Sequence, residues 1–292
     1  MKNSDFGRKS VIIGLGKTGI SVAKYFSAKG LPFEFMDTRL NPPMLKEFKT
    51  LFPNTKIEVG KLEERSLLGA KELIVGPGLS IKTPEIQKAK DFGIPVRGDI
   101  DIFSKEAKAP IIGVTGSNGK STVVALLSSI LNSSGKNVGL GGNLDGSNTK
   151  SALDLLEDED KDIYLLELSS FQLETTEFLG AEVAVLLNLS EDHMDRYESL
   201  NEYHEAKLRV FNGCRQLVIN RDDVYSHPKN KFDVPVWDFG VDYPNSNSLG
   251  ISERQGKQYI TYKLEEIVAV SDLKIFGQHN ISNALAAVTL AL

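Results

Sequence analysis

The stretch GVTGSNGKST, residues 113–122, combines glycines with a Lys-Ser pair that could bind the phosphates of a nucleotide. An apolar run precedes it and a helix-like run follows. The glycines therefore lie at a strand-to-helix turn, where backbone N–H groups and the helix dipole attract anions. The usual phosphate loop has a glycine six positions before its lysine; this sequence has Val114 there, and Gly116 partly replaces it. We predict that Lys120 reaches terminal phosphates and that Ser121 holds Mg²⁺. A turn that only caps the helix is the alternative.

A second glycine loop, GLGKTG, occupies residues 14–19 and has the Gly-x-Gly-x-x-Gly spacing that follows the first strand of dinucleotide-binding folds. Asp37 ends the next strand-like run, at the distance expected for an acid that contacts a ribose. The pattern predicts a site for a dinucleotide or for another ligand with a diphosphate. Thr38 and Arg39 follow directly and offer a hydroxyl and a guanidinium. A close helix–strand crossing would explain the glycines but would give residues 37–39 no purpose.

Acidic residues and a histidine follow two later apolar runs. Glu167 ends the run YLLEL, where its carboxylate could cap the next turn or bind Mg²⁺ opposite the phosphate loop. The segment NLSEDHMDR, residues 188–196, adds three acidic residues and His193 after another strand. A second metal ligand and a solvated loop are both compatible with this cluster.

Lys207 interrupts an apolar helix face. In NEYHEAKLRVF, residues 201–211, helical spacing places Tyr203, Ala206, Val210 and Phe211 on one face, with Lys207 in its middle. The lysine could extend its stem outward to keep its ammonium in water. Alternatively, a desolvated amine with a lowered pKa could act as a nucleophile.

The elements that position these residues alternate between strand-like and helix-like runs, which predicts an α/β protein with mainly parallel sheets. Ligands of such sheets bind beyond the carboxyl ends of the strands, where the glycine, hydroxyl and acidic residues gather here. A polar stretch at residues 104–110 indicates a domain boundary, and the alternation after about residue 235 predicts some antiparallel strands. The expected strands span residues 10–15, 33–37, 72–76, 110–116, 137–142, 162–168 and 181–189.

Composition excludes several classes of protein. The 292 residues are 41% hydrophobic and 25% charged, with a net charge of -5 that is not arranged in blocks. We therefore expect no binding to nucleic acid or to a membrane surface. A single cysteine, Cys214, cannot form an internal disulfide, and the polar N-terminus has no secretory signal, so we expect a soluble cytoplasmic protein.

Taken together, the segments GVTGSNGKST, GGN, LELSSFQLE, NLSEDHMDRY, AKLRVF and GQHNISNALAA resemble the Mur ligases, from about residue 8 to the end. Within that family they are most similar to the members that add D-glutamate to UDP-N-acetylmuramoyl-L-alanine in peptidoglycan synthesis. The resemblance implies a Rossmann-like UDP-binding domain over residues 1–106 and a central ATP-binding domain over residues 107–292. An apolar residue at the Val114 position is normal in the family's ATP loop. The first glycine loop then resembles the family's UDP site rather than an NAD site.

The resemblance also implies roles for individual residues. It implies ATP and two Mg²⁺ ions, an acyl phosphate formed on the substrate carboxylate, and a Lys207 carbamylated by CO₂ that bridges the metals. Lys120, Lys207, His193 and Glu167 would be catalytic, and Ser121, Glu167, His193 and Lys207 would bind metal. The ATP contacts would be Gly116, Ser117, Asn118, Gly119, Lys120, Ser121 and Thr122, with Asn280 and Asn283 near the adenine. The UDP-substrate contacts would be Lys17, Thr18, Asp37, Thr38, Arg39, Gly76, Asn143, Ser169 and Gln172.

Two departures from the family pattern qualify these expectations. Family members commonly carry serine where this sequence has Gly76, so a hydroxyl contact to the substrate is absent. Members also have a third, amino-acid-binding domain beyond the point where this sequence stops, so we expect the 292 residues, as a monomer, not to complete the ligation alone. The alternatives are a ligase of the folylpolyglutamate type and a non-catalytic two-domain nucleotide-binding module. An NAD-dependent oxidoreductase would leave the Gly-Lys-Ser loop without a use.

Overall fold

The computed structural model describes residues 8–144, 149–158, 160–229, 232–245 and 248–292 of the chain. These residues form two compact units, and the chain passes from the first to the second between Glu106 and Ala107. Two later segments, Lys150–Glu157 and Phe171–Glu177, return to the first unit. The amide of Gly98 donates a hydrogen bond to the carbonyl of Thr175, and Ser21 donates one to Asp154, which attaches both segments to it. A single cut after residue 106 does not describe this exchange.

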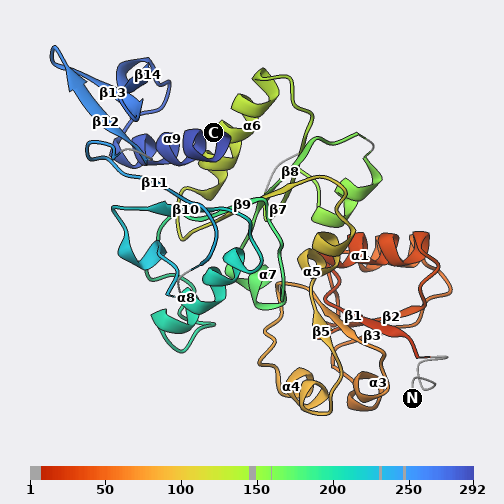
Figure 1. Cartoon of the computed structure of the whole chain (residues 1–292). Coiled ribbons are helices and arrows are strands. Elements are labelled where there is room, and N and C mark those ends of the chain that lie inside the picture. The colour runs from red at the N-terminus through yellow and green to blue at the C-terminus, as the bar shows by residue number, and fades with distance from the viewer. Residues whose placement is uncertain (1–7, 145–148, 159, 230–231, 246–247) are drawn as a thin grey trace. The chain divides into compact units, whose positions relative to one another are not determined.

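The first unit contains a five-stranded sheet in the order β3-β2-β1-β4-β5, in which every strand pair is parallel (Figure 1). This order is half of a doubly wound fold, in which the carboxyl ends of β1 and β4 flank the point where the strand order reverses. The strands are β1 Ser10–Ile13, β2 Phe33–Asp37, β3 Ile57–Val59, β4 Leu73–Val75 and β5 Val96–Arg97. The helices are α1 Lys17–Ala28, α2 Leu45–Leu51, α3 Glu64–Leu68, α4 Pro84–Asp91 and α5 Asp99–Glu106.

The second unit contains a nine-stranded sheet in the order β14-β13-β12-β11-β10-β9-β6-β8-β7. The strands from β7 to β12 in this order are parallel, and β12, β13 and β14 pair antiparallel. The strands are β6 Ile111–Thr115, β7 Val138–Gly142, β8 Ile163–Glu167, β9 Val183–Leu186, β10 Leu217–Asn220, β11 Val236–Phe239, β12 Ser248–Arg254, β13 Lys257–Tyr262 and β14 Glu265–Ala269. The α-helices of this unit are α6 Lys120–Ser133, α8 Leu200–Leu208 and α9 Gln278–Ala291, and its 3₁₀ helices are η2 Arg209–Phe211, η3 Val224–Ser226 and η4 Val270–Asp272. The 3₁₀ helix η1 Ala152–Glu157 and, apart from Ser170, the α-helix α7 Ser170–Glu174 lie in the two segments that return to the first unit.

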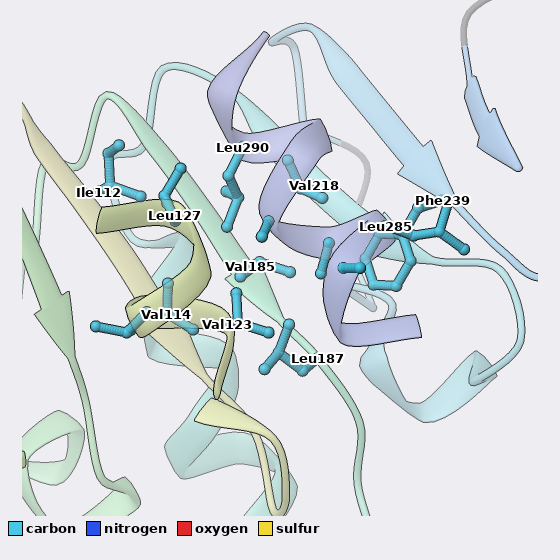
Figure 2. Close-up of a cluster of buried hydrophobic side chains, with 14 of the residues drawn as sticks. Ile112, Val114, Val123, Leu127, Val185, Leu187, Val218, Phe239, Leu285 and Leu290 are labelled. Carbon is cyan, nitrogen blue, oxygen red and sulfur yellow. The ribbon is translucent and has the colours of Figure 1, made fainter. Parts of the chain in front are cut away.

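The core of the second unit lies between this sheet and the helix pair α6 and α9 (Figure 2). Val123 and Leu127 from α6 and Leu285 from α9 are fully buried against Val185 of β9. Removing apolar side chains of this size from water contributes about 1.5 to 3 kcal/mol each. This packing fixes the amino-terminal ends of both helices, which carry the phosphate loop and the two asparagines at residues 280 and 283.

The expectation of an α/β protein with mainly parallel sheets is confirmed, as are the seven expected strands and the antiparallel strands after residue 235. The strands not expected are β3, β5, β10 and β11, which have two to four residues each. None of the helices among the described residues is long and apolar enough to cross a membrane.

Candidate functional site

The predicted phosphate loop connects β6 to α6, so its amides lie at the positive end of a 14-residue helix. Gly119 immediately precedes the helix in a left-handed conformation, with φ +84°. The left-handed conformation favours glycine at this position, and a Cβ there would lie 2.4 Å from Oδ1 of Asn283 on α9, so the Asn283 side chain would have to shift. Asn283 is buried, and its Nδ2 donates to Oδ1 of Asn280 at 3.1 Å. The structure thus brings Asn283 against the loop, with Asn280 as its neighbour.

Lys120 folds back onto its own loop. Its Nζ donates hydrogen bonds to the carbonyl oxygens of Gly116 at 2.9 Å and Ser117 at 3.0 Å. Burial lowers the pKa of the ammonium, and the nearby carboxylates of Glu167 and Asp192 partly oppose that effect. The ammonium is thus held by neutral carbonyls, which a phosphate oxygen could replace with a charge-assisted contact.

Glu167 joins the phosphate loop to two other predicted residues. Ser121 donates its hydroxyl to Oε2 of Glu167 at 2.7 Å, and Asn143 donates Nδ2 to Oε1 at 3.3 Å. The side chain is buried because Glu167 is the last residue of β8, between β6 and β7 in the sheet. Within the described parts of the chain, no group of three or more His, Cys, Asp or Glu residues is arranged to hold a metal ion. The protein therefore offers a carboxylate and a hydroxyl here rather than a complete metal cage.

Lys207 is buried, with 2% of the residue exposed, and does not extend its stem to solvent. Its Nζ donates to the carbonyl oxygen of Gly116 at 2.8 Å and lies 4.7 Å from the centre of the Tyr203 ring. Burial and then the positive charge of Lys120 lower the pKa of Lys207 to about 7, against the raising effects of Asp192 and Glu167. A large fraction of the amine is therefore neutral near pH 7.

Helix α8 holds Lys207 in this position. Ser199 caps the helix by accepting a hydrogen bond from the Glu202 amide at 3.2 Å, and the Glu202 carboxylate accepts one from the Glu198 amide at 3.0 Å. The remaining members of the predicted apolar face, Tyr203, Ala206, Val210 and Phe211, are all buried. The helix is therefore fixed by its cap and by its buried face, with the lysine inside that face.

The loop after β9 forms contacts with the phosphate loop that the sequence did not reveal. Asn188 accepts from the amide of Asn118 at 2.9 Å and donates Nδ2 to the Asn118 carbonyl at 3.0 Å. Ser117 donates its hydroxyl to the carbonyl of Ser190 at 3.1 Å and accepts from the Ser190 amide at 3.0 Å. The Ser117 hydroxyl is also 3.3 Å from that of Tyr203. The usable signal was the presence of two polar residues, Asn188 and Ser190, within four positions of the end of β9, a strand that neighbours β6.

His193 lies in the same loop but differs from the other predicted metal ligands in its surroundings. Its backbone is left-handed, with φ +54°, and 46% of its side chain is exposed. The ring lies 6.3 Å from the ring of Tyr203, and its Nε2 is 3.5 Å from a carboxylate oxygen of Asp192. The imidazole is therefore accessible to a ligand from solvent, next to the aromatic ring that contacts Lys207.

The first unit has a pocket of about 300 Å³ at the carboxyl ends of β1, β2 and β4. It collects six of the predicted substrate residues, Lys17, Thr18, Asp37, Thr38, Arg39 and Gly76. Asp37 accepts from the Leu15 amide at 2.7 Å and from the Arg39 guanidinium at 2.6 and 2.9 Å. Burial raises the pKa of Asp37, but the bonds from Arg39 and the backbone amides outweigh it and hold the pKa below its usual value. The pocket therefore pairs a fixed carboxylate with a half-exposed guanidinium.

The glycines of the first loop are explained by close contact as well as by ligand access. A Cβ on Gly19 of α1 would lie 2.2 Å from the carbonyl oxygen of Gly14, so α1 can approach β1 only if residue 19 is glycine. Gly16, by contrast, lines the pocket, and a Cβ built there would meet no atom within 4 Å. The helix-crossing explanation therefore holds for Gly19, and the ligand explanation fits Gly16.

The other predicted substrate residues lie outside this pocket lining. Asn143 and Ser169 belong to the second unit, and Gln172 is buried in the first. The Gln172 side chain forms a hydrogen bond with Asp99, a buried acid at the start of α5. Burial raises the pKa of Asp99 to about 6, although this bond and two backbone amides lower it. No pattern in the sequence predicts the pairing of Gln172 with Asp99.

A phosphate loop on a parallel sheet, together with a separate glycine-loop pocket on a half-Rossmann sheet, defines a two-unit nucleotide-binding α/β protein. The Mur ligase middle domain matches residues 114–291, and the N-terminal domain of MurD-like Mur ligases matches residues 8–98. The chain belongs to the Mur ligase family.

Relatives with curated names are similar over nearly the whole chain. The UDP-N-acetylmuramoylalanine--D-glutamate ligase of Pseudomonas aeruginosa is 46% identical over 280 residues, which cover 96% of this chain and 61% of the relative. The enzyme of the same name from Hahella chejuensis is 45% identical, over 97% of this chain and 62% of the relative. The chain thus spans about three fifths of the length of these relatives.

Solved structures of more distant relatives share the fold. A UDP-N-acetylmuramate:L-alanyl-gamma-D-glutamyl-meso-diaminopimelate ligase from Neisseria meningitides has a TM-score of 0.62 at 19% identity, covering 98% of this chain and 93% of that one. A UDP-N-acetylmuramate-alanine ligase from Thermotoga maritima has a TM-score of 0.55 at 20% identity, over 97% and 64% of the two chains. At these identities the likeness supports the fold alone.

Proposed function

We propose that this chain carries the UDP-substrate and ATP sites of a ligase that adds D-glutamate to UDP-N-acetylmuramoyl-L-alanine in peptidoglycan synthesis. The observation that carries the proposal is the convergence of two lysines on one carbonyl oxygen of the phosphate loop, that of Gly116. A plain nucleotide-binding module needs only the first lysine, Lys120. The buried second lysine, Lys207, adds a reactive amine at the place where the phosphoryl group would be transferred. The names of the curated relatives support the choice of substrates.

In the first unit, the pocket beyond β1 would hold the UDP part of the substrate. The loop amides at residues 14–19 would face the diphosphate, and Asp37 would accept hydrogen bonds from a hydroxyl of the ligand. Half of the Arg39 side chain is exposed, so the guanidinium can turn from Asp37 toward an anionic group without disturbing the buried core. Gly76 contributes only backbone to the lining.

In the second unit, the loop from Gly116 to Thr122 would bind ATP. Lys120 would exchange the carbonyls of Gly116 and Ser117 for phosphate oxygens, while the amino-terminal end of α6 stabilises negative charge. Asn283, which lies on α9 beside Gly119, and its neighbour Asn280 would contact the base. The substrate carboxylate would then attack the γ-phosphate to give an acyl phosphate, and the amine of D-glutamate would displace phosphate to form the amide.

The residues around Glu167 fit a magnesium site. Mg²⁺ prefers oxygen ligands and usually takes one or two carboxylates, with substrate phosphates and water completing its shell. The Glu167 carboxylate and the Ser121 hydroxyl, already joined at the mouth of the phosphate loop, supply that partial set. His193 would add a further ligand. When bound, the metal would neutralise charge on the phosphates.

Lys207 would serve this site as a carbamate. Its neutral form is the one that reacts with CO₂, and burial beside Lys120 favours that form. Addition of CO₂ to the neutral amine forms an N–C bond and releases one proton, so the neutral side chain becomes an anion. The carbamate would then be a ligand for magnesium and a partner for the ammonium of Lys120.

Trapping of the acyl phosphate tests this function. The protein is incubated with ATP, Mg²⁺, UDP-N-acetylmuramoyl-L-alanine and hydroxylamine, which converts an acyl phosphate to a hydroxamate. We expect a hydroxamate that depends on both substrates, its loss in Lys120→Ala, and its retention in the exposed control Lys136→Ala. Hydroxamate formation that is unaffected by Lys120→Ala would contradict the proposed role of the loop.

A further inference from the structure

The first unit has a second pocket, of about 440 Å³, at the end of the sheet opposite the proposed UDP site. Four of the residues that line it are basic: Arg8 and Lys9 before β1, Lys56 before β3, and Arg65 on α3. The acidic residue in the lining is Glu34 of β2. The four residues of β1, about 13 Å of extended chain, separate the two pockets, so neither the proposed function nor its ligands account for this one.

The charges of this basic pocket are unbalanced. Lys9 and Lys56 share the carboxylate of Glu34, with Nζ–Oε distances of 2.9 and 3.5 Å, and Lys56 also pairs with Glu58 at 2.6 Å. The guanidinium groups of Arg8 and Arg65 have neither an ion pair nor a hydrogen bond with any residue that the structure describes. A lining with four cations and one carboxylate in a chain of net charge -5 concentrates positive charge at one place. Such a concavity attracts an anion.

The shape of the basic pocket narrows the class of anion. Part of its lining is apolar and buried, because Val11 and Ala70 are 2% and 3% exposed. A volume of about 440 Å³ is within the range of small-molecule sites, whereas nucleic acid and membranes need an extended or protruding basic face. Guanidinium groups match phosphate geometry through paired N–H donors, and two of them are available here.

We propose that the basic pocket binds a small, multiply charged phosphate compound, held mainly by Arg8 and Arg65. Lys9 and Lys56 add longer-range attraction while Glu34 keeps them in place. Four cations and one carboxylate in the lining carry more positive charge than one phosphate group balances, which favours a ligand with at least two phosphate groups. The site is separate from the ATP loop, which belongs to the other unit.

Residue-resolved protection tests the location. The protein is treated with an arginine-specific dicarbonyl reagent with and without inorganic tripolyphosphate, and each arginine is quantified by peptide mass spectrometry. We expect at least threefold slower modification of Arg8 and Arg65, with unchanged rates at Arg215 and Arg254. Those two control arginines are 78% and 71% exposed and lie in the second unit. Equal protection at all four arginines, or none at Arg8 and Arg65, would overturn the proposal.

Charge-matched variants test the affinity. Isothermal titration with tripolyphosphate at physiological salt compares Arg8→Ala/Arg65→Ala with Arg215→Ala/Arg254→Ala, which removes the same net charge. We expect the first pair to lose one binding event, or to weaken it at least tenfold, and the second pair to retain it. Fructose 1,6-bisphosphate and inorganic phosphate form further arms. Binding of the bisphosphate assigns the site to organic phosphates, and binding of tripolyphosphate alone assigns it to inorganic ones. Equal weakening by both pairs, or a preference for nucleic acid or anionic vesicles, would refute a specific small-molecule pocket.

Discussion

Replacing Lys207 by methionine should stabilise the second unit at pH 7 while removing the group proposed for catalysis. Methionine keeps a long apolar stem but has no ammonium to desolvate. In the unfolded chain the lysine has its ordinary pKa of 10.5, whereas burial beside Lys120 lowers it to about 7 in the folded state. That pKa difference corresponds to about 5 kcal/mol of unfavourable free energy for the charged form. Loss of the hydrogen bond to the Gly116 carbonyl offsets about 1 to 2 kcal/mol. We therefore expect Lys207→Met to raise the free energy of unfolding at pH 7 by about 2 to 4 kcal/mol.

The extra stability of Lys207→Met should decrease as the pH rises from 7 to about 10. Between pH 7 and pH 10.5 the unfolded wild-type chain binds more protons at Lys207 than the folded chain, so wild-type stability rises with pH relative to the variant. The advantage of Lys207→Met should thus be largest at and below pH 7 and should be lost near pH 10.

Urea denaturation in CO₂-free buffer measures this difference. The fluorescence of Trp237, the single tryptophan of the chain, reports on the second unit because the residue lies in β11. The exposed Lys136→Met variant controls for loss of a lysine and should show a difference within about 0.5 kcal/mol at every pH. A Lys207→Met variant that is less stable than wild type at pH 7, or a difference that is constant from pH 6 to 10, would refute the reasoning.

Four further predictions concern the two proposed ligand sites. Arg39→Ala should weaken binding of UDP-N-acetylmuramoyl-L-alanine by about 1 to 3 kcal/mol in calorimetry, because a charged hydrogen-bond donor is lost; unchanged affinity would exclude a contact. Lys120→Ala should abolish ATP binding yet leave UDP affinity intact, and loss of both ligands would indicate a structural role. Gly19→Ala should destabilise the first unit by about 1 to 3 kcal/mol in thermal unfolding, because its Cβ would meet the Gly14 carbonyl, whereas Gly78→Ala, with open space, should not. Native mass spectrometry in bicarbonate should show an added CO₂ that is absent in Lys207→Met; the same addition in both would place the carbamate elsewhere.

Much of the fold could be predicted because parallel strands buried on both faces appear as unbroken apolar runs. The strands from Ile111 and from Ile163 are of this kind, and their glycine and acidic ends are where ligands bind in such sheets. The two-residue strand Val96–Arg97 has no detectable pattern of its own and forms only because β4 offers an edge. The return of residues 150–157 and 171–177 to the first unit depends on tertiary contacts with Ser21 and Gly98, which no local pattern encodes.

The candidate site shows the same division between local and long-range information. The phosphate loop and the placement of Lys207 on an apolar face follow from glycine spacing and helical period, which are local properties. The contact of Lys207 with Gly116 joins residues 91 positions apart, and the Asn118–Asn188 pair joins residues 70 apart. Such pairings require the strand order of the sheet, which a single sequence does not specify. Roles taken from the family resemblance, including those of His193 and Gln172, stay predictions.

The central claim is that the first glycine loop binds a UDP-linked precursor and the second binds ATP. Calorimetric titration with UDP-N-acetylmuramoyl-L-alanine tests this claim most directly. NADH and folate, the ligands expected for the alternative functions, are titrated in separate experiments. We predict saturable binding of the UDP compound that Arg39→Ala weakens and Lys120→Ala leaves unchanged, with no comparable binding of NADH or folate. Tight binding of NADH without any response to the UDP compound would contradict it.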